Sequence, residues 1–215
     1  EVTLDLATPM ARIVKTSFPR TKLISERFHV QQLANEAVQE IRIKHKWDAT
    51  EQDNKAMDLA KEEKKPWLAE ILENGYTLKQ LLARSRYVLY KSPSKWTCNQ
   101  KQRAEILFYL YPDIHIAYQL TQQLKAIFEK TKEKVYAYAK LAKWHDRVNK
   151  AGFKTFNSIS RTIQNHYKTI LNYFDNRSTN ASAESFNAKI KAFRTQFRGV
   201  RNIEYFLYRL TQIYA

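Results

Sequence analysis

Glycine and proline are scarce in this sequence, with 3 glycines and 5 prolines spread over 215 residues. A fold with many strands needs tight turns, and tight turns depend mainly on these two residues. Their scarcity therefore disfavours a many-stranded β fold and favours a chain made mainly of helices. The single cysteine, Cys98, excludes an internal disulfide framework and a cysteine-based zinc site, and it fits a reducing compartment.

The first 25 residues depart from the helical pattern. Residues 2–4 form a short β-branched run that ends at Asp5, and Thr8-Pro9 provides the start of a helix. Residues 21–25 read as a second short strand, so this segment predicts one βαβ unit with two parallel strands. Because parallel strands must be covered on both faces, we expect residues upstream of Glu1, or a separate polypeptide, to complete the sheet.

Residues 31–174 read as one all-helical block. Apolar residues from Leu33 onward predict a helix that ends at Trp47, and a charged, solvated helix is expected over 50–65. Asn74-Gly75 marks a turn. The helices expected after that turn cover residues 78–89, 99–111, 113–130, 131–150 and 157–174.

The charge balance points to a polyanionic partner. The chain has 37 Lys and Arg against 21 Asp and Glu, a formal charge of +16, which makes nucleic acid the default inference. A membrane surface is the competing partner. The sequence contains neither an 18-residue apolar run nor a signal-peptide pattern, so we expect a soluble, cytoplasmic protein without a membrane partner.

Residues 177–201 form a basic block, RSTNASAESFNAKIKAFRTQFRGVR, with capping side chains at 178–180. Ile190, Phe193 and Phe197 recur at helical spacing and can face a core. Glu184 is the only acid in the block, and it has two readings: a capping or helix-dipole acid, or a metal ligand beside a nucleic-acid backbone. Five cations are candidates for phosphate contacts: Lys189, Lys191, Arg194, Arg198 and Arg201.

Conventional catalytic motifs are mostly absent. The five histidines show no metal-ligand spacing, and the sequence has no glycine-rich phosphate loop. Asp5 at a strand end and Glu184 at a helix start remain. Mg²⁺ prefers carboxylate oxygens on rigid elements, and a two-metal site for phosphoryl transfer needs several of them, so these two residues are one too few.

The closing segment contains Thr-Asn-x-x-x-Glu-x-x-Asn, then Lys-x-Lys and Arg-Gly-x-Arg-Asn, and the opening segment contains VTLDLATP followed by Phe-Pro and Arg-Phe-His-Val. With these motifs the whole chain resembles the DDE transposases of bacterial insertion sequences. It is most similar to the subgroup whose RNase H-like core carries a long all-α insertion between the second Asp and the Glu. The resemblance implies a mainly α fold with a partial RNase H-like α/β core.

The resemblance implies three units: a partial catalytic core over 1–30, an all-helical insertion over 31–174 and C-terminal core helices over 175–215. Asp5 matches the second catalytic acid and Glu184 the third, and together they would hold two Mg²⁺ ions, with Mn²⁺ as a substitute. The first acid has no counterpart here. The chain thus looks like the C-terminal part of a split or truncated transposase, inactive on its own.

The same resemblance suggests DNA contacts outside the acids. Arg27 and His29 match a motif that helps position the active site or the donor strand, whereas Glu26 departs from the Asp that the family usually has. In related transposases an aromatic residue of the insertion can stack on a flipped DNA base, and the candidates here are Trp144, Trp96 and Trp67. The alternative for each of them is burial in the hydrophobic core.

The implied partners are double-stranded DNA of transposon ends and target, further copies of the chain, and a separate N-terminal transposase segment, with the protein associated with the nucleoid. A second reading needs no chemistry: a basic helical DNA-binding protein or a decayed transposase remnant. Convergence of Asp5 and Glu184 within metal-bridging reach would favour the transposase reading.

Overall fold

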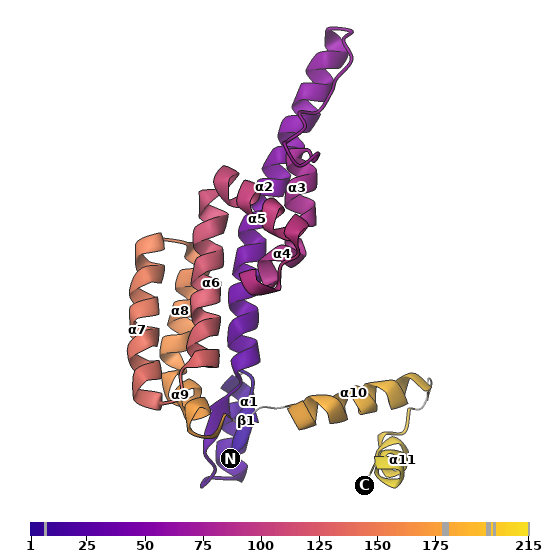
Figure 1. Cartoon of the computed structure of the whole chain (residues 1–215). Coiled ribbons are helices and arrows are strands. Elements are labelled where there is room, and N and C mark those ends of the chain that lie inside the picture. Colours follow the sequence, from indigo (N-terminus) through magenta and orange to yellow (C-terminus); the bar gives the residue numbers. More distant parts are fainter. Residues whose placement is uncertain (7, 178–180, 197–198, 200, 215) are drawn as a thin grey trace.

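The computed structural model describes residues 1–6, 8–177, 181–196, 199 and 201–214, with the side chains of residues 8, 181–184, 186–187 and 214 outside the description. Helices make up 77% of the structure, and the described residues contain one sheet of two short parallel strands. This confirms the expected mainly α fold with a small α/β unit near the N-terminus. Figure 1 shows one long helix, α2 (Arg27–Glu62), with several other helices packed alongside its inner half.

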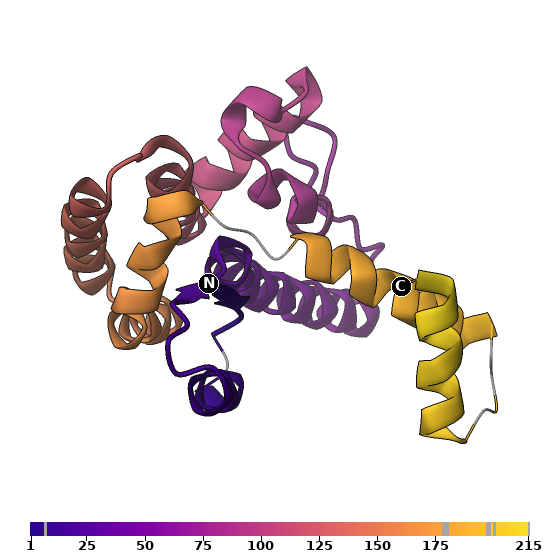
Figure 2. The same ribbon diagram turned by 90° about the horizontal axis from the view of Figure 1, so that it is seen from below.

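The N-terminal unit has the predicted order of strand, helix and strand. β1 (Val2–Leu4) pairs in parallel with β2 (Leu23–Ser25), and α1 (Thr8–Ser17) connects them. All three residues of β2 are buried. The helix α9 (Tyr167–Asn176) packs against β2, where the Asn172 side-chain amide donates to the Leu23 carbonyl oxygen at 2.9 Å. Figure 2 shows the strands next to α9 and α1.

Helix α2 runs without interruption from Arg27 to Glu62, 36 residues. The prediction of a first helix ending at Trp47 and a separate one over 50–65 is therefore wrong. No glycine or proline occurs between Pro19 and Pro66, so nothing in the backbone stops the helix where the apolar pattern ends. Its inner half is buried against α6 (Pro112–Lys130), whereas its last buried residue is Ala49 and its tip projects beyond the other helices (Figure 1).

Three short helical segments follow the tip. Gly75 adopts a φ of 77° in the expected turn, and α3 (Leu78–Arg84) begins with a capping box at Thr77. The helix expected over 78–89 is instead two helices, because α4 (Arg86–Tyr90) starts after Ser85. Ser85 is fully buried and its hydroxyl donates to the Leu81 carbonyl oxygen at 2.6 Å, a bond that weakens the regular helical ladder. A single 3₁₀ turn (Pro93–Lys95) leads into α5 (Cys98–Leu110).

The second half of the helical body contains α6, α7 (Lys134–Ala151), α8 (Lys154–Asn165) and α9. Gly152 ends α7 in the left-handed conformation, with a φ of 72°. The helix expected over 157–174 is also two helices, since the chain leaves helical geometry at His166. Asn165 and His166 are weak helix formers, and the break directs α9 toward β2, where the hydroxyls of Thr169 and Ser25 are 2.7 Å apart.

One hydrophobic core connects α2 through α9, and its largest fully buried side chains are Trp144 and Phe156. Beyond α9, α10 (Ala181–Gln196) and α11 (Ile203–Tyr214) lie to one side of this body in both views (Figures 1 and 2). Phe193 of α10 is buried, with its ring centroid 5.3 Å from that of Phe206 on α11. Within the described ranges, no helix has both the length and the apolar character needed to cross a membrane.

Candidate active site and nucleic-acid interface

Two acidic residues follow directly on the paired strands. Asp5 follows β1 and Glu26 follows β2, and the Glu26 backbone N–H donates to the Leu4 carbonyl oxygen at 2.9 Å. Parallel strands place their carboxyl ends at one edge of a sheet, so Asp5 and Glu26 are neighbours across that edge. Asp5 is exposed, whereas Glu26 is buried.

The first turn of α2 begins at the same edge. His29 Nε2 lies 3.4 Å from Glu26 Oε2, and Arg27 and His29 are each partly buried. Glu26, expected only as a departure from the family's usual Asp, stands at a strand end just as Asp5 does. That shared position was visible in the sequence and could have drawn attention to Glu26.

Glu184 lies in the first turns of α10, and its side chain is outside the described residues. The convergence of Asp5 and Glu184 accordingly stays a prediction. The exposed Asp5 carboxylate has the ligand chemistry that Mg²⁺ prefers. Among the side chains that the structure describes, no group of three or more His, Cys, Asp or Glu residues could hold a metal ion.

The basic residues of the C-terminal block lie mostly at the surface. Lys189, Lys191 and Arg194 are exposed on α10, and Arg201 is exposed just before α11. Phe193 is buried, so α10 has an apolar contact with α11 as well as exposed cationic residues. Arg198 lies outside the described residues, as do Phe197 and the capping residues 178–180.

The tryptophans expected to stack on DNA are not equally accessible. Trp144 is only 2% exposed, and its indole N–H donates to the Leu120 carbonyl oxygen at 2.8 Å. A ring held in the core has no face open to a base, so Trp144 is corrected to a core residue. Trp96 is partly buried and stacks on Tyr118 with centroids 5.7 Å apart, and Trp67 is partly buried.

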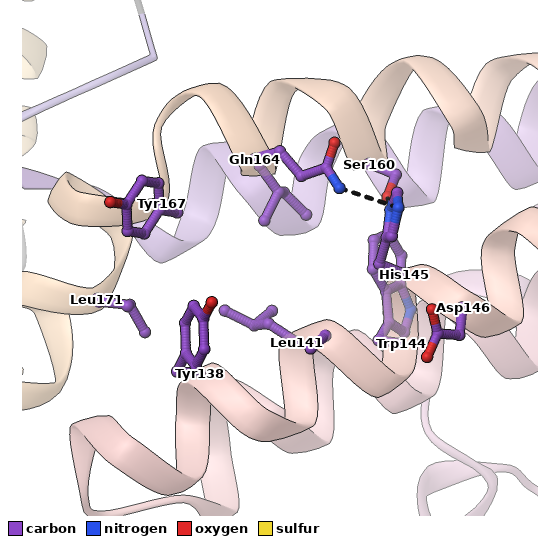
Figure 3. A pocket seen from close by; sticks show the side chains of 11 residues that line it. Tyr138, Leu141, Trp144, His145, Asp146, Ser160, Gln164, Tyr167 and Leu171 are labelled. Atoms are coloured by element: carbon purple, nitrogen blue, oxygen red, sulfur yellow. Dashed lines mark hydrogen bonds between the residues drawn. The ribbon is translucent and has the colours of Figure 1, made fainter.

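A cleft of about 330 Å³ lies between α7 and the pair α8 and α9. Figure 3 shows His145 directed from α7 toward Ser160 and Gln164 of α8, with Tyr138 and Tyr167 at the other end. The Gln164 side-chain nitrogen lies 2.9 Å from His145 Nε2, and the Ser160 hydroxyl contacts His145 Nδ1. Asp146 also lines the cleft, and none of its lining residues is a lysine or arginine.

Comparison with known protein families matches residues 1–210 to the transposases, in the DDE group designated ISL3. Searches of curated proteins and of solved structures returned no match. The family match covers the strand-end acids, the helical body, and helix α10 with its basic residues. Because it spans nearly the whole sequence, the chain belongs to the DDE transposase family.

Proposed function

We propose that this chain takes part in DNA transposition as a polynucleotidyl transferase, with Asp5 and Glu184 as two of its catalytic carboxylates. The family match supports transposition in general. The observation that carries the finer assignment is the position of Asp5, an exposed carboxylate directly after β1 in a parallel βαβ unit. A rigid strand end holds a ligand oxygen in a fixed place, as a hard divalent cation requires.

In this proposal Asp5 and Glu184 would hold Mg²⁺ or Mn²⁺. A metal bound there would supply Lewis acidity toward the scissile phosphate and the attacking oxygen. Glu26 and His29 act as positioning residues, since their 3.4 Å contact ties the end of β2 to the first turn of α2 beside Asp5. Arg27, partly buried on the same turn, orients the donor strand.

DNA is held mainly by cations in this proposal. Lys189, Lys191, Arg194, Arg198 and Arg201 bind phosphates of double-stranded DNA at the transposon end and the target. Contacts of this kind give strongly salt-dependent affinity with little dependence on base sequence.

We further propose that the protein acts as a homo-oligomer, and that 1–30, 31–174 and 175–215 are its functional units. The border at residue 30 falls inside α2, so the first two units share one helix. This continuity supports a rigid connection between the sheet edge that carries Asp5 and the helical insertion.

Mn²⁺ titration followed by NMR tests the metal assignment directly, because bound Mn²⁺ broadens the amide signals of nearby residues. We expect broadening of residues 2–6 and of the first turns of α10. Asp5→Asn and Glu184→Gln should each abolish it, while DNA affinity at fixed salt changes little.

Asp53→Asn, on the projecting half of α2, serves as the matched control because it also removes one carboxylate. Broadening that persists in both site variants would overturn the metal assignment. DNA binding without any site-specific broadening would instead support the second reading, a basic protein that binds DNA without cutting it.

A further inference from the structure

A groove between α6 and α7 concentrates positive charge in the helical body. Four cations line it, Lys130 from α6 and Lys140, Lys143 and Arg147 from α7, and its volume is about 260 Å³. We propose that this groove is a second DNA-binding site, which grips the phosphate backbone of a duplex separately from α10. The inference goes beyond the proposed function because it requires neither Asp5 nor Glu184.

The three α7 cations share one face of the helix. Positions 140, 143 and 147 are three and four residues apart, the spacing at which helical side chains lie above one another. Lys130, at the end of α6, adds a fourth charge from the facing helix. Cations gathered along one groove can contact several phosphates of a DNA strand together.

These charges are not neutralised by acids within the groove. No Asp or Glu is among its lining residues, and Lys130, Lys143 and Arg147 form no ion pair with the described part of the chain. Lys140 donates a hydrogen bond to the Thr131 hydroxyl at 3.1 Å, a neutral partner. Cations brought together without counter-charges repel one another, so an anionic ligand stabilises the arrangement.

The opposite side of α7 shows that this charge is local. There the cleft of Figure 3 is lined by His145 and Asp146 and by no lysine or arginine. Trp144 lies beneath both surfaces and lines both of them, fixed through its bond to Leu120. The groove thus has Trp144 as a fixed floor, and the α7 cations gather on the face of the helix that lines it, as expected of a surface that binds a phosphate backbone.

Exposed lysines at the tip of α2 and in the loop just after it provide a contrast. Lys55, Lys61 and Lys65 are each paired with a nearby carboxylate, at 2.7, 3.1 and 2.8 Å respectively. They carry the same charge as the groove cations but have local partners. They therefore provide a control set with the same number of charges.

The first test is duplex DNA binding by fluorescence anisotropy over a salt series. Lys140→Gln, Lys143→Gln and Arg147→Gln combined should lower affinity about tenfold and reduce the slope of log K against log salt by roughly 2.7, three phosphate contacts at about 0.9 each. Lys55→Gln, Lys61→Gln and Lys65→Gln combined should leave the slope nearly unchanged. Equal slopes in the two triple variants would overturn the groove assignment.

The second test locates the DNA and does not depend on the stability of the triple variant. Cys98 is the single cysteine and is exposed, so Cys98→Ser gives a background without thiols. Lys143→Cys in that background should form a disulfide with duplex DNA that carries a thiol on its backbone, whereas Lys55→Cys should not. Equal yields at the two positions would contradict the proposal.

Two further arms separate the possible failures. A variant with Lys189, Lys191 and Arg194 neutralised tests α10 alone. If this variant loses DNA binding while the groove variant binds DNA as the unmodified protein does, the proposed function is upheld and the groove is rejected as a DNA site. Single-stranded RNA that displaces the duplex at a lower concentration than duplex DNA itself would assign the groove to RNA and overturn the proposal.

Discussion

Asp5 and Glu26 follow the paired ends of two parallel strands, since Leu4 pairs with Ser25 and the Glu26 N–H donates to the Leu4 carbonyl oxygen. Their environments differ. Asp5 is exposed, while Glu26 is buried and lies 3.4 Å from a ring nitrogen of His29. At this edge of the sheet, the accessible Asp5 therefore suits the role of a metal ligand. The buried Glu26 beside it suits the role of a positioning residue.

This difference predicts unequal effects of removing each charge. Asp5→Asn should abolish Mn²⁺ binding, because it removes a ligand oxygen's charge. Glu26→Gln should weaken binding by roughly 10- to 100-fold without abolishing it, the usual effect of losing a supporting residue, and Glu26→Asp should restore it. Calorimetric titration with Mn²⁺ measures all three. A loss after Glu26→Gln as complete as that after Asp5→Asn would make Glu26 a ligand.

Trp144 is expected to matter for stability rather than for DNA contact. Trp144→Phe loses the hydrogen bond to Leu120 and some packing, so the free energy of unfolding should fall by about 1–2 kcal/mol, and Trp144→Ala should cost about 3–5 kcal/mol. Urea unfolding measures both values. Duplex affinity of the folded Trp144→Phe protein should be unchanged, and a tenfold loss would return Trp144 to the DNA interface.

Asp175 makes folding sensitive to acid. Its carboxylate lies 2.6 Å from Lys22 Nζ and 3.3 Å from Lys134 Nζ, and the bond from Lys22 is the main cause that lowers the pKa of Asp175 below its ordinary value of 3.8. A lowered pKa in the folded state means that the unfolded chain binds the proton more readily. The stabilisation is therefore present above about pH 4 and is lost as pH falls through the lower folded pKa.

Asp175→Asn should lower the Tm by roughly 1–3 °C at pH 7, because the pair is exposed and screened. The difference from the unmodified protein should shrink toward zero by about pH 2, where both states are protonated. Thermal melts across pH 2–7 provide the check. A Tm difference of equal size at both ends of that range would show that packing, and not charge, is responsible.

The projecting half of α2 should melt without the core. Asn54→Pro interrupts the helix beyond its last buried residue, Ala49, so helical content should drop slightly while the main Tm stays within about 1 °C. Trypsin should then cut at Lys55 and Lys61. Val38→Pro, in the buried half, is the control and should unfold the whole protein. A large loss of Tm after Asn54→Pro would mean that the tip is part of the cooperative unit.

Local sequence signals predicted the elements that local chemistry determines. The strands and α1 follow from a β-branched run ending in an acid and from Thr8-Pro9, and the turn follows from the Asn74-Gly75 pair, where Gly75 adopts a positive φ. The breaks at Ser85 and His166 were missed because neither position carries glycine or proline. Ser85 breaks the helix through a buried hydroxyl bond, and the break at His166 lets α9 reach β2, contacts that exist only after folding.

The candidate site shows the same division. Asp5 was predictable because an acid at a strand end needs only the strand, whereas the burial of Glu26 against His29 needs the start of α2 as well. The burial of Trp144 depends on contacts with other helices, such as its bond to Leu120 of α6, and could not be read from the spacing of aromatic residues. The groove cations were visible at helical spacing on residues 140–147, but their neighbour Lys130 comes from another helix.

The unbroken course of α2 gives the molecule a mechanical property. Its 36 residues, at about 1.5 Å per residue, make a rod of roughly 54 Å that is separated from β2 by Glu26 alone. A tilt of about 5° at Arg27 would displace the far end by roughly 5 Å over that length. Because α6 packs along the inner half of α2, one continuous helix joins the body that carries the α6–α7 groove to the sheet edge that carries Asp5 and Glu26.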